Sequence, residues 1–396
     1  MSGFEVAARD RRGVPAPGMT VFGFLAAALF LASSSAPTPI YHLYQDALGL
    51  SPLTLTVIFA AYAISLLGAL LTVGGLSDHV GRRPVIFAAL MLNAAALVLF
   101  LWAETAAMLI AARCVQGMAV GSATAALGAA ILDSDRARGP LLNSITAFVG
   151  LAAGSLGSGT LVAFAPDPMR LVFELLLGAT LVLAALTWAM PETTSGKPGA
   201  LASLRPDLHV PARARPALLG IAPVNVAGWA LGGFYFSLMP SLVRAATGLQ
   251  SPFIGGVVVA VLPLTATLAV LGLREVGAER LLRICAYALV AGVSITLAGV
   301  ASHRVALMLL GAVVAGIGFG TVLSGTMRTL LPLAGEHERA GLLSAYYVGG
   351  YLAFSLPSLL VGLLASRIGL PAAGALYGAV VIVLALISLA TMSRPR

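Results

Sequence analysis

The sequence GGLSDHVGRRP, residues 74–84, is a short polar island between two long apolar runs. The flanking runs, residues 53–73 and 85–102, are each long enough for a helix that crosses a bilayer, which takes roughly 20 apolar residues. An aspartate, two adjacent arginines and several glycines are more than a solvated turn between two such helices needs. The island therefore predicts a joint where two membrane helices move against another part of the protein.

The composition of the chain is that of an integral membrane protein. Hydrophobic residues make up 59% of the sequence, charged residues only 10%, and the mean hydropathy is +0.99. A soluble domain carries about 25% charged residues. The apolar runs are continuous and do not alternate with polar residues, which favours helices over the strands of an outer-membrane barrel.

Cys114 and Cys285 lie within apolar runs, so we expect no disulfide, metal site or other cofactor.

The hydropathy pattern predicts an all-α membrane protein with twelve transmembrane helices in two six-helix bundles. The expected spans are residues 20–36, 53–73, 85–102, 106–132, 145–165, 171–190, 218–242, 254–273, 281–301, 305–323, 341–365 and 371–391. A polar, proline-rich stretch at 191–216 divides them into two groups of six, a plan common among transporters. The expected domains are a cytoplasmic tail (1–18), an N-terminal bundle (19–193), a cytoplasmic central loop (194–216) and a C-terminal bundle (217–393).

Lysine and arginine are distributed unevenly between the two sides of this predicted topology. With a cytoplasmic N-terminus, 18 of the 23 cationic residues fall in inside segments and four fall outside, while Arg113 lies within a span. The positive-inside rule predicts this bias, with both termini in the cytoplasm. The sequence pI of about 10.0 therefore reports membrane topology. We expect a multi-pass protein of the cell (inner) membrane with no nucleic-acid partner.

Three local patterns, together with the six-plus-six division, resemble the major facilitator superfamily over nearly the whole chain. The first is the island, whose matching residues are Gly74, Leu76, Asp78, Gly81, Arg82 and Arg83. Glycine permits tight turns and close helix approach, and Asp78 can accept charge-assisted hydrogen bonds. The resemblance implies a conformational latch, and the alternative is a plain positive-inside loop. His79 departs from the pattern, which usually has arginine there, and the second-half loop at 272–283 lacks a matching aspartate.

The second pattern is Arg113-Cys114-Val115-Gln116-Gly117 within the fourth span. A charge at the centre of a span costs on the order of 2.5–3.5 kcal/mol, so it needs a partner or a wet cavity. Arg113, Gln116 and Gly117 lie on one helical face. The pattern resembles the family's R-x-x-Q-G motif, which implies that Arg113 and Gln116 take part in proton coupling. The alternative is an arginine that snorkels to the outer interface.

The third pattern is a run of small residues in the fifth span, with Gly150, Gly154 and Gly157. It resembles the glycine-rich antiporter motif of drug exporters, which favours export. Ser155 and Ser158 depart from that motif, where proline and glycine are usual. The alternative is ordinary helix packing, which small residues such as these glycines and Gly117 permit in any membrane bundle. Residues 191–193, Pro-Glu-Thr, resemble the signature that ends the first half in this family.

Candidates for a substrate cavity come from the spans that line the cavity in this fold. They are Tyr41, Tyr44, Tyr62, Asn143, Asn225, Trp229, Tyr235, Tyr346, Tyr347 and Tyr351. Each could equally serve in packing or at an interface. The sequence places no aspartate or glutamate in the middle of a predicted span, so only Asp46 and Glu174, near span ends, join Arg113 and Gln116 as coupling candidates.

These features predict a secondary active transporter that works by alternating access, and not an enzyme. We expect a monomer in the lipid bilayer that exports a small amphipathic organic molecule in exchange for protons. A sugar or metabolite importer or uniporter of the same fold stays open, because the glycine motif is incomplete and no acid lies in mid-membrane. A non-transporting membrane sensor is a remote alternative. An intramembrane enzyme would need clustered catalytic groups, whereas the five histidines are scattered.

Overall fold

The computed structural model describes residues 17–249 and 251–392, which are mostly helical. The first half contains α1 (Pro17–Ser35), α2 (Pro37–Leu48), α3 (Pro52–Val73), α4 (Ser77–Val80), α5 (Arg82–Leu101), α6 (Ala106–Ser134), α7 (Gly139–Phe164) and α8 (Leu171–Thr187). The second half contains α9 (Arg215–Ser237), α10 (Met239–Thr247), α11 (Pro252–Gly272), α12 (Ala278–Ala301), α13 (Val305–Leu330), α14 (Arg339–Ile368) and α15 (Leu370–Met392). Short 3-10 helices lie at Ala202–Leu204 (η1), Leu331–Leu333 (η2) and Glu336–Glu338 (η3). Arg9, Arg11, Arg12, Arg394 and Arg396, with most of the tail expected at 1–18, lie outside the described residues.

The helices confirm the predicted all-α membrane fold. Within the described ranges, 11 helical segments are long and apolar enough to cross a membrane, and α8 is a shorter apolar helix. The first span, predicted to end at residue 36, corresponds to α1, which ends at Ser35, but the helical segment continues through α2 to Leu48. The polar side chains of α2 had lowered the local hydropathy and hidden this extension.

One span in each half is broken just before a proline. Helices α1 and α2 meet at Ala36, ahead of Pro37, and α9 and α10 meet at Leu238, ahead of Pro240. Proline is tolerated in the first turn of a helix, but it offers no N–H to the turn before it. The same break in both halves is a structural likeness between them.

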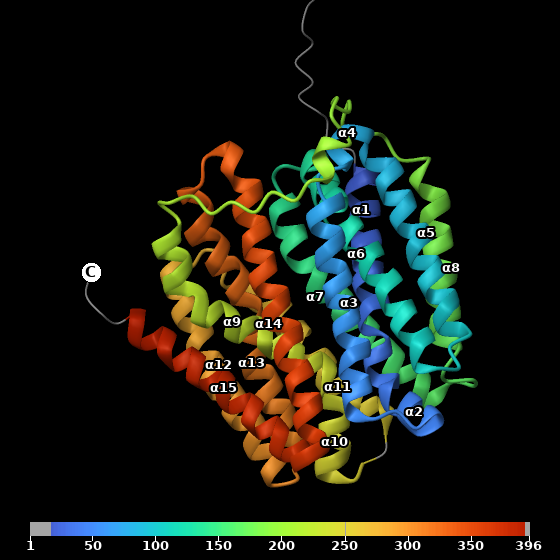
Figure 1. Ribbon diagram of the computed structural model, residues 1–396, viewed down its shortest axis with the longest axis vertical. Helices are drawn as coiled ribbons and strands as arrows, with labels where there is room; N and C mark the ends of the chain where they lie inside the picture. The colour runs from blue at the N-terminus through green and yellow to red at the C-terminus, as the bar shows by residue number, and fades with distance from the viewer. Residues whose placement is uncertain (1–16, 250, 393–396) are drawn as a thin grey trace, which may run out of the picture.

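The helices of each half pack mainly on one another, and the two halves meet along two seams, α3 with α14 and α7 with α11 (Figure 1). Small residues bring the helices close: a Cβ on Gly159 of α7 would lie 3.0 Å from the Cα of Gly256 on α11. A Cβ on Gly362 of α14 would overlap the side chain of Thr56 on α3. These contacts lie toward the end of the molecule that carries α2 and α10. Figure 1 shows the halves diverging toward the end that carries α4.

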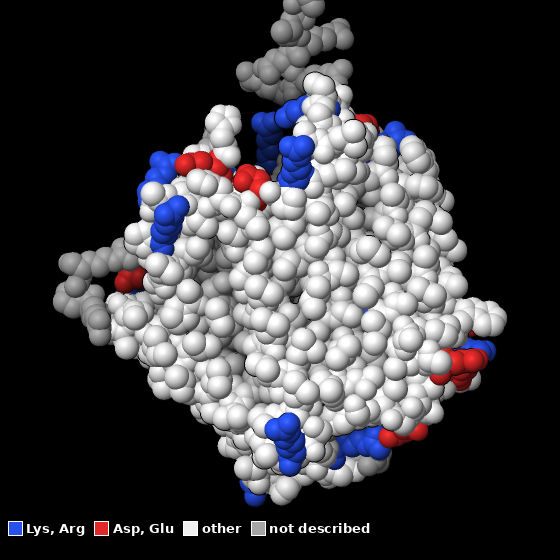
Figure 2. Space-filling model, in the orientation of Figure 1, with Lys and Arg blue, Asp and Glu red and all other residues white. Residues whose placement is uncertain are grey.

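We call the end with α4 and the connecting segment 188–214 the linker face, and the end with α2 and α10 the opposite face. Figure 2 shows charged side chains gathered toward both ends, with a broad belt of other residues between them. Large apolar side chains such as Leu268 and Leu360 are exposed. A belt of this kind suits the hydrocarbon core of a bilayer, which is about 30 Å thick.

The glycines singled out in the sequence differ in what surrounds them. Gly150 and Gly154 of α7 lie directly on α1, and Gly117 of α6 lies on α3. A Cβ on Gly157 would meet no atom within 4 Å, so the packing role predicted for Gly157 is wrong. Its place on the helix turns it away from α1, which the spacing of glycines alone could not reveal.

Replacing Gly154 by leucine should destabilise the first half, because this glycine lies directly against Ala32 and Ser35 of α1. Overpacking costs typically 1–3 kcal/mol, so we expect a lower thermal-unfolding temperature for the purified protein in detergent. Gly157→Leu is the matched control, with the same change on the same helix. Equal unfolding temperatures for the two variants would contradict this packing.

Candidate functional site

A cavity of about 170 Å³ lies between the two halves. Residues of α1, α2, α3, α6 and α7 line it from the first half, and residues of α9, α13 and α14 line it from the second. The walls are mainly aromatic and aliphatic, with a few hydroxyl and amide groups. Asn143 and Ser144 extend the lining toward the linker face, because α7 begins at that face.

Arg113 is the only charged side chain among the described residues that line this cavity. It is 1% exposed. Its Nη1 donates to the carbonyl of Ser34 at 2.9 Å and to Oε1 of Gln116 at 2.6 Å. The guanidinium lies 4.3 Å from the centroid of the Tyr62 ring, within the range of a cation–π contact. The side chain therefore does not snorkel to the membrane surface.

The break between α1 and α2 supplies the backbone acceptors for Arg113 and Gln116. Pro37 has no N–H to offer the carbonyl of Ser33 four residues earlier, and Nε2 of Gln116 donates to that carbonyl at 2.9 Å. The neighbouring carbonyl of Ser34 accepts from Arg113. A backbone group left unpaired in the membrane is costly, so the broken helix and the two polar side chains of α6 satisfy each other.

Trp229 of α9 is the centre of an aromatic wall on the second-half side of the cavity. The ring of Tyr351 lies 4.9 Å from it, centroid to centroid, and Nε1 of Trp229 donates to the hydroxyl of Tyr346 at 3.0 Å. Phe354 of α14 is stacked on Phe59 of α3 at 5.0 Å, so this wall also joins the two halves. Gly350 permits the arrangement, because a Cβ there would lie 2.5 Å from the indole ring.

The structure brings some of the predicted cavity residues together and leaves others apart. Those that line the cavity are Tyr62, Asn143, Trp229 and Tyr351. Tyr346 and Tyr347 contact Trp229 without lining the cavity.

The remaining cavity candidates are buried elsewhere, so their predicted place in the cavity is wrong. Tyr41 and Tyr44 pack in a cluster with Ile40 and Ile58. The hydroxyl of Tyr235 lies 2.8 Å from Oγ1 of Thr296, inside the second half. Asn225 is buried and does not line this cavity. The direction in which each of these side chains faces depends on the rotation of its helix about the helix axis. The sequence alone does not determine that rotation.

The two carboxylates named as coupling candidates lie away from the cavity. Asp46 of α2 pairs with Arg244 of α10, with 2.9 Å between Oδ2 and Nη1 and 3.4 Å between Oδ1 and Nη2. This pair bridges the two halves at the opposite face. Glu174 is exposed near the start of α8.

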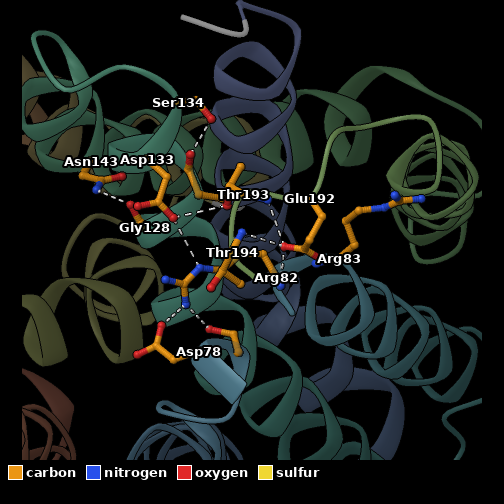
Figure 3. Close-up of polar contacts among 12 residues, drawn as sticks. Asp78, Arg82, Arg83, Gly128, Asp133, Ser134, Asn143, Glu192, Thr193 and Thr194 are labelled. Carbon is orange, nitrogen blue, oxygen red and sulfur yellow. Dashed lines mark hydrogen bonds and ion pairs between the residues drawn. The ribbon is translucent and has the colours of Figure 1, made fainter. Parts of the chain in front are cut away.

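The predicted latch forms a polar network around Arg82 at the linker face (Figure 3). Arg82 is largely buried; its Nη1 pairs with Asp78 and donates to Oγ of Ser77 at 2.6 Å. Its Nε lies 3.5 Å from Oδ2 of Asp133, at the end of α6. The network of Figure 3 thus joins α4, α5 and α6 within the first half.

Glu192, part of the Pro-Glu-Thr signature at 191–193, is also a member of this network. Its two carboxylate oxygens accept from the backbone N–H groups of Arg82 at 2.9 Å and Arg83 at 3.1 Å. These N–H groups begin α5, where the helix dipole favours a negative charge. Gly81, with φ of +106°, leaves room for the carboxylate, because a Cβ there would lie 2.8 Å from Oε2 of Glu192. Thr193 adds a hydrogen bond to Asp133 at 3.2 Å.

His79 attaches the linker to the island. Its Nδ1 lies 3.2 Å from the carbonyl of Lys197 and 3.0 Å from that of Pro198. Since both neighbours are acceptors, Nδ1 carries the proton. The backbone N–H of Lys197 in turn donates to the carbonyl of His79 at 3.2 Å. The departure from arginine at this position thus coincides with a contact to the connecting segment.

The corresponding loop of the second half is held with the charges arranged differently. Arg328, at the end of α13, donates to the carbonyl of Val276 at 2.8 Å and to that of Arg274 at 2.7 Å. In the first half, Arg82 at the start of α5 pairs with Asp78 of α4 and lies near Asp133 of α6. In the second half, Arg328 of α13 donates to backbone carbonyls of the loop, so this contact uses no aspartate.

An all-helical membrane protein with two packed halves, a broken helix in each and a cavity between them has the architecture of a secondary transporter. The family model described as "Major Facilitator Superfamily" matches residues 23–293, more than half of the chain, so this chain belongs to the major facilitator superfamily.

Comparison with curated proteins finds a partial relative. Over 163 residues the chain is 31% identical to "Multidrug resistance protein MdtL" of Escherichia coli O45:K1 (strain S88 / ExPEC), and equally to that of strain UTI89 / UPEC. The match covers 38% of this chain and 41% of each relative, less than half of their length.

Solved structures share the fold over nearly the whole chain. The nucleoside transporter NupG has a TM-score of 0.71 at 13% identity, with 95% of this chain and 98% of that one covered. The human organic anion transporter MFSD10 (TETRAN) gives 0.68 at 16%, covering 95% and 100%. A POT family transporter in complex with 5-aminolevulinic acid gives 0.73 at 14%, covering 95% and 96%. At these identities the likeness shows the fold alone.

Replacing Glu192 by glutamine should destabilise the first half by about 1 kcal/mol, because the charge that caps α5 is lost. Thermal unfolding of the purified protein measures the change. Glu275→Gln is the control, since that carboxylate is exposed and lies outside the helices. A Glu192→Gln variant as stable as the control would contradict the capping role.

Proposed function

We propose that this protein exports a small amphipathic organic molecule by alternating access, in exchange for protons. The observation on which the proposal rests is the aromatic cavity between the halves, lined by both of them. The resemblance of the α7 glycines to the antiporter motif, and the partial match to a protein named for multidrug resistance, support export.

The linker face is proposed to be the cytoplasmic one. Among the described residues, the connections at the linker face hold most of the lysines and arginines, whereas Arg170, Arg244, Arg304 and Arg367 lie at the other end. The positive-inside rule supports a linker face on the cytoplasmic side of the cell membrane, with both termini on that side. The cavity lining approaches the cytoplasm at Asn143, which suits loading of cargo for export.

The two halves are proposed to be the rocking units, with bundles at 19–193 and 217–393 joined by a cytoplasmic loop at 194–216. The close contacts at Gly159–Gly256 and Gly362–Thr56 support a state that is closed at the opposite face. Opening that face requires these seams to separate.

The Arg82 network is proposed as the latch, because it holds α4, α5 and α6 as one body. A monomer contains all the parts that this cycle uses.

Asp46 is the proposed proton carrier, because it pairs with Arg244 across the halves. Protonation would remove the carboxylate charge and weaken the closure of the opposite face. Both side chains are partly exposed, at 58% for Asp46 and 31% for Arg244, and such pairs contribute about 0.2–1 kcal/mol. Loss of this ion pair is therefore expected to change the equilibrium between the closed and open states of the opposite face by no more than about fivefold.

A uniporter or importer of the same fold is the second candidate. It is favoured by one observation: none of the described residues that line the cavity is an aspartate or glutamate. A proton-coupled carrier usually has a protonatable group in its path. The two candidates differ in whether a proton gradient changes the direction or extent of transport.

Transport by protein reconstituted in liposomes tests the proposed function. Single-ring amphipathic compounds should accumulate against their gradient only when a pH gradient is imposed, and Asp46→Asn should reduce that dependence. Glu104→Gln is the control, because Glu104 is an exposed acid of the same face. Transport that is indifferent to the gradient in the unmodified protein would overturn antiport and favour the uniporter.

The latch hypothesis predicts that Asp78→Asn reduces the transport rate while leaving the amount of folded protein unchanged. The substitution removes the acid that pairs with Arg82 four residues later. The matched control is Glu279→Gln, which breaks the i,i+4 pair with Arg283 next to the corresponding loop of the second half. If both variants transport at the unmodified rate, the island is an ordinary loop.

A further inference from the structure

The charge in the cavity is unbalanced. Arg113 is the one charged group among the described lining residues, and the groups that contact it are neutral: a backbone carbonyl, the amide of Gln116 and the ring of Tyr62. Arginine keeps its charge in proteins. A buried charge without a counter-ion is unfavourable, so this site favours a negatively charged occupant.

The hydrogen bonding of Arg113 also leaves donor capacity free. Both of its hydrogen bonds come from Nη1. The buried Nε has no partner in the described part of the chain. Hydrogen bonds from a guanidinium to a carboxylate are charge-assisted, and they are roughly twice as strong as those between neutral groups.

The rest of the cavity selects for an apolar ring. Trp229, Tyr351 and Phe354 line it from the second half, and Phe59 lines it from the first. The volume of about 170 Å³ is close to that of engineered apolar cavities of ~150 Å³ that bind benzene. A single aromatic ring with a short acidic group fits this space.

We propose that the cargo is a single-ring aromatic monocarboxylate, whose carboxylate pairs with Arg113 and whose ring lies among the aromatic side chains around Trp229. This inference rests on the proposed function, because it names the cargo class of the same cavity. A cationic cargo would place a second positive charge beside Arg113, and a neutral one would leave Arg113 unbalanced. A dianion would bring one charge more than the cavity can match.

Benzoate, benzamide and benzamidine form a matched probe set, with nearly the same size and charges of −1, 0 and +1. Isothermal titration of each into purified, unmodified protein should show benzoate binding at least tenfold more tightly than benzamide, and benzamidine most weakly. Equal affinities, a preference for benzamidine, or saturable binding of none of the three would overturn the proposal.

Two variants assign the preference to Arg113. Arg113→Gln should remove the advantage of benzoate over benzamide, whereas Arg113→Lys should keep its direction with a smaller ratio, since the charge remains but the planar edge is lost. A preference for benzoate that survives in Arg113→Gln would overturn the assignment. If Arg113→Gln does not fold, the ratio in Arg113→Lys compared with the unmodified protein decides, and an unchanged ratio counts against the proposal.

Transport separates this inference from the proposed function. If liposomes with the protein export benzamidine or benzamide but not benzoate, the export function stands and the anion site fails. If they export none of the probes while the binding order benzoate, benzamide, benzamidine holds, the anion site stands and the export function fails.

Discussion

The hydrogen bonding of one buried guanidinium organises the centre of this protein. Arg113 lies in a span, where a charge costs on the order of 2.5–3.5 kcal/mol unless other groups stabilise it. The break at Ala36–Pro37 provides the carbonyls of Ser33 and Ser34, and α6 returns two polar side chains to them. Because α1, α2 and α6 must meet at this point, the wall of the cavity is fixed there. The polar centre and the proline break are therefore one feature of the fold.

The two faces differ in which helices their contacts join. At the opposite face, glycines at Gly159, Gly256 and Gly362 let helices of different halves touch, and one partly exposed ion pair adds to them. At the linker face, the Arg82 network binds helices of the same half. An arrangement of this kind suits rigid halves that move relative to each other, with small and reversible contacts between them.

An anionic cargo would change how export is driven. The membrane potential contributes about 2.3 kcal/mol per 100 mV for each charge moved, and it favours an anion leaving a negative interior. Such a cargo could leave the cell down the electrical gradient without a carboxylate in the cavity. The absence of an acid among the described lining residues and the presence of Arg113 would then have one explanation.

The sequence predicted the elements of the fold better than the composition of the site. Continuous apolar runs and the polar stretch at 191–216 were enough for the helices, and Arg113 and Gln116 could be placed on one face because their spacing fixes it. The sequence does not determine where Tyr41 and Tyr235 lie, because aromatic residues near a span end look alike whichever way they face. It does not show the role of Glu192, because the partners of Glu192, Arg82 and Arg83, lie more than 100 residues earlier and meet it only in the folded chain.

Alternating access requires the opposite face to open during each transport cycle. Cysteines in place of Asp46 and Arg244, in protein without Cys114 and Cys285, allow a short cleavable thiol crosslinker to join the halves at that face. Downhill exchange of radiolabelled cargo across liposomes is the measurement. We expect exchange to stop when the crosslink forms and to return when it is cleaved. Exchange at an unchanged rate in fully crosslinked protein would contradict alternating access in this molecule.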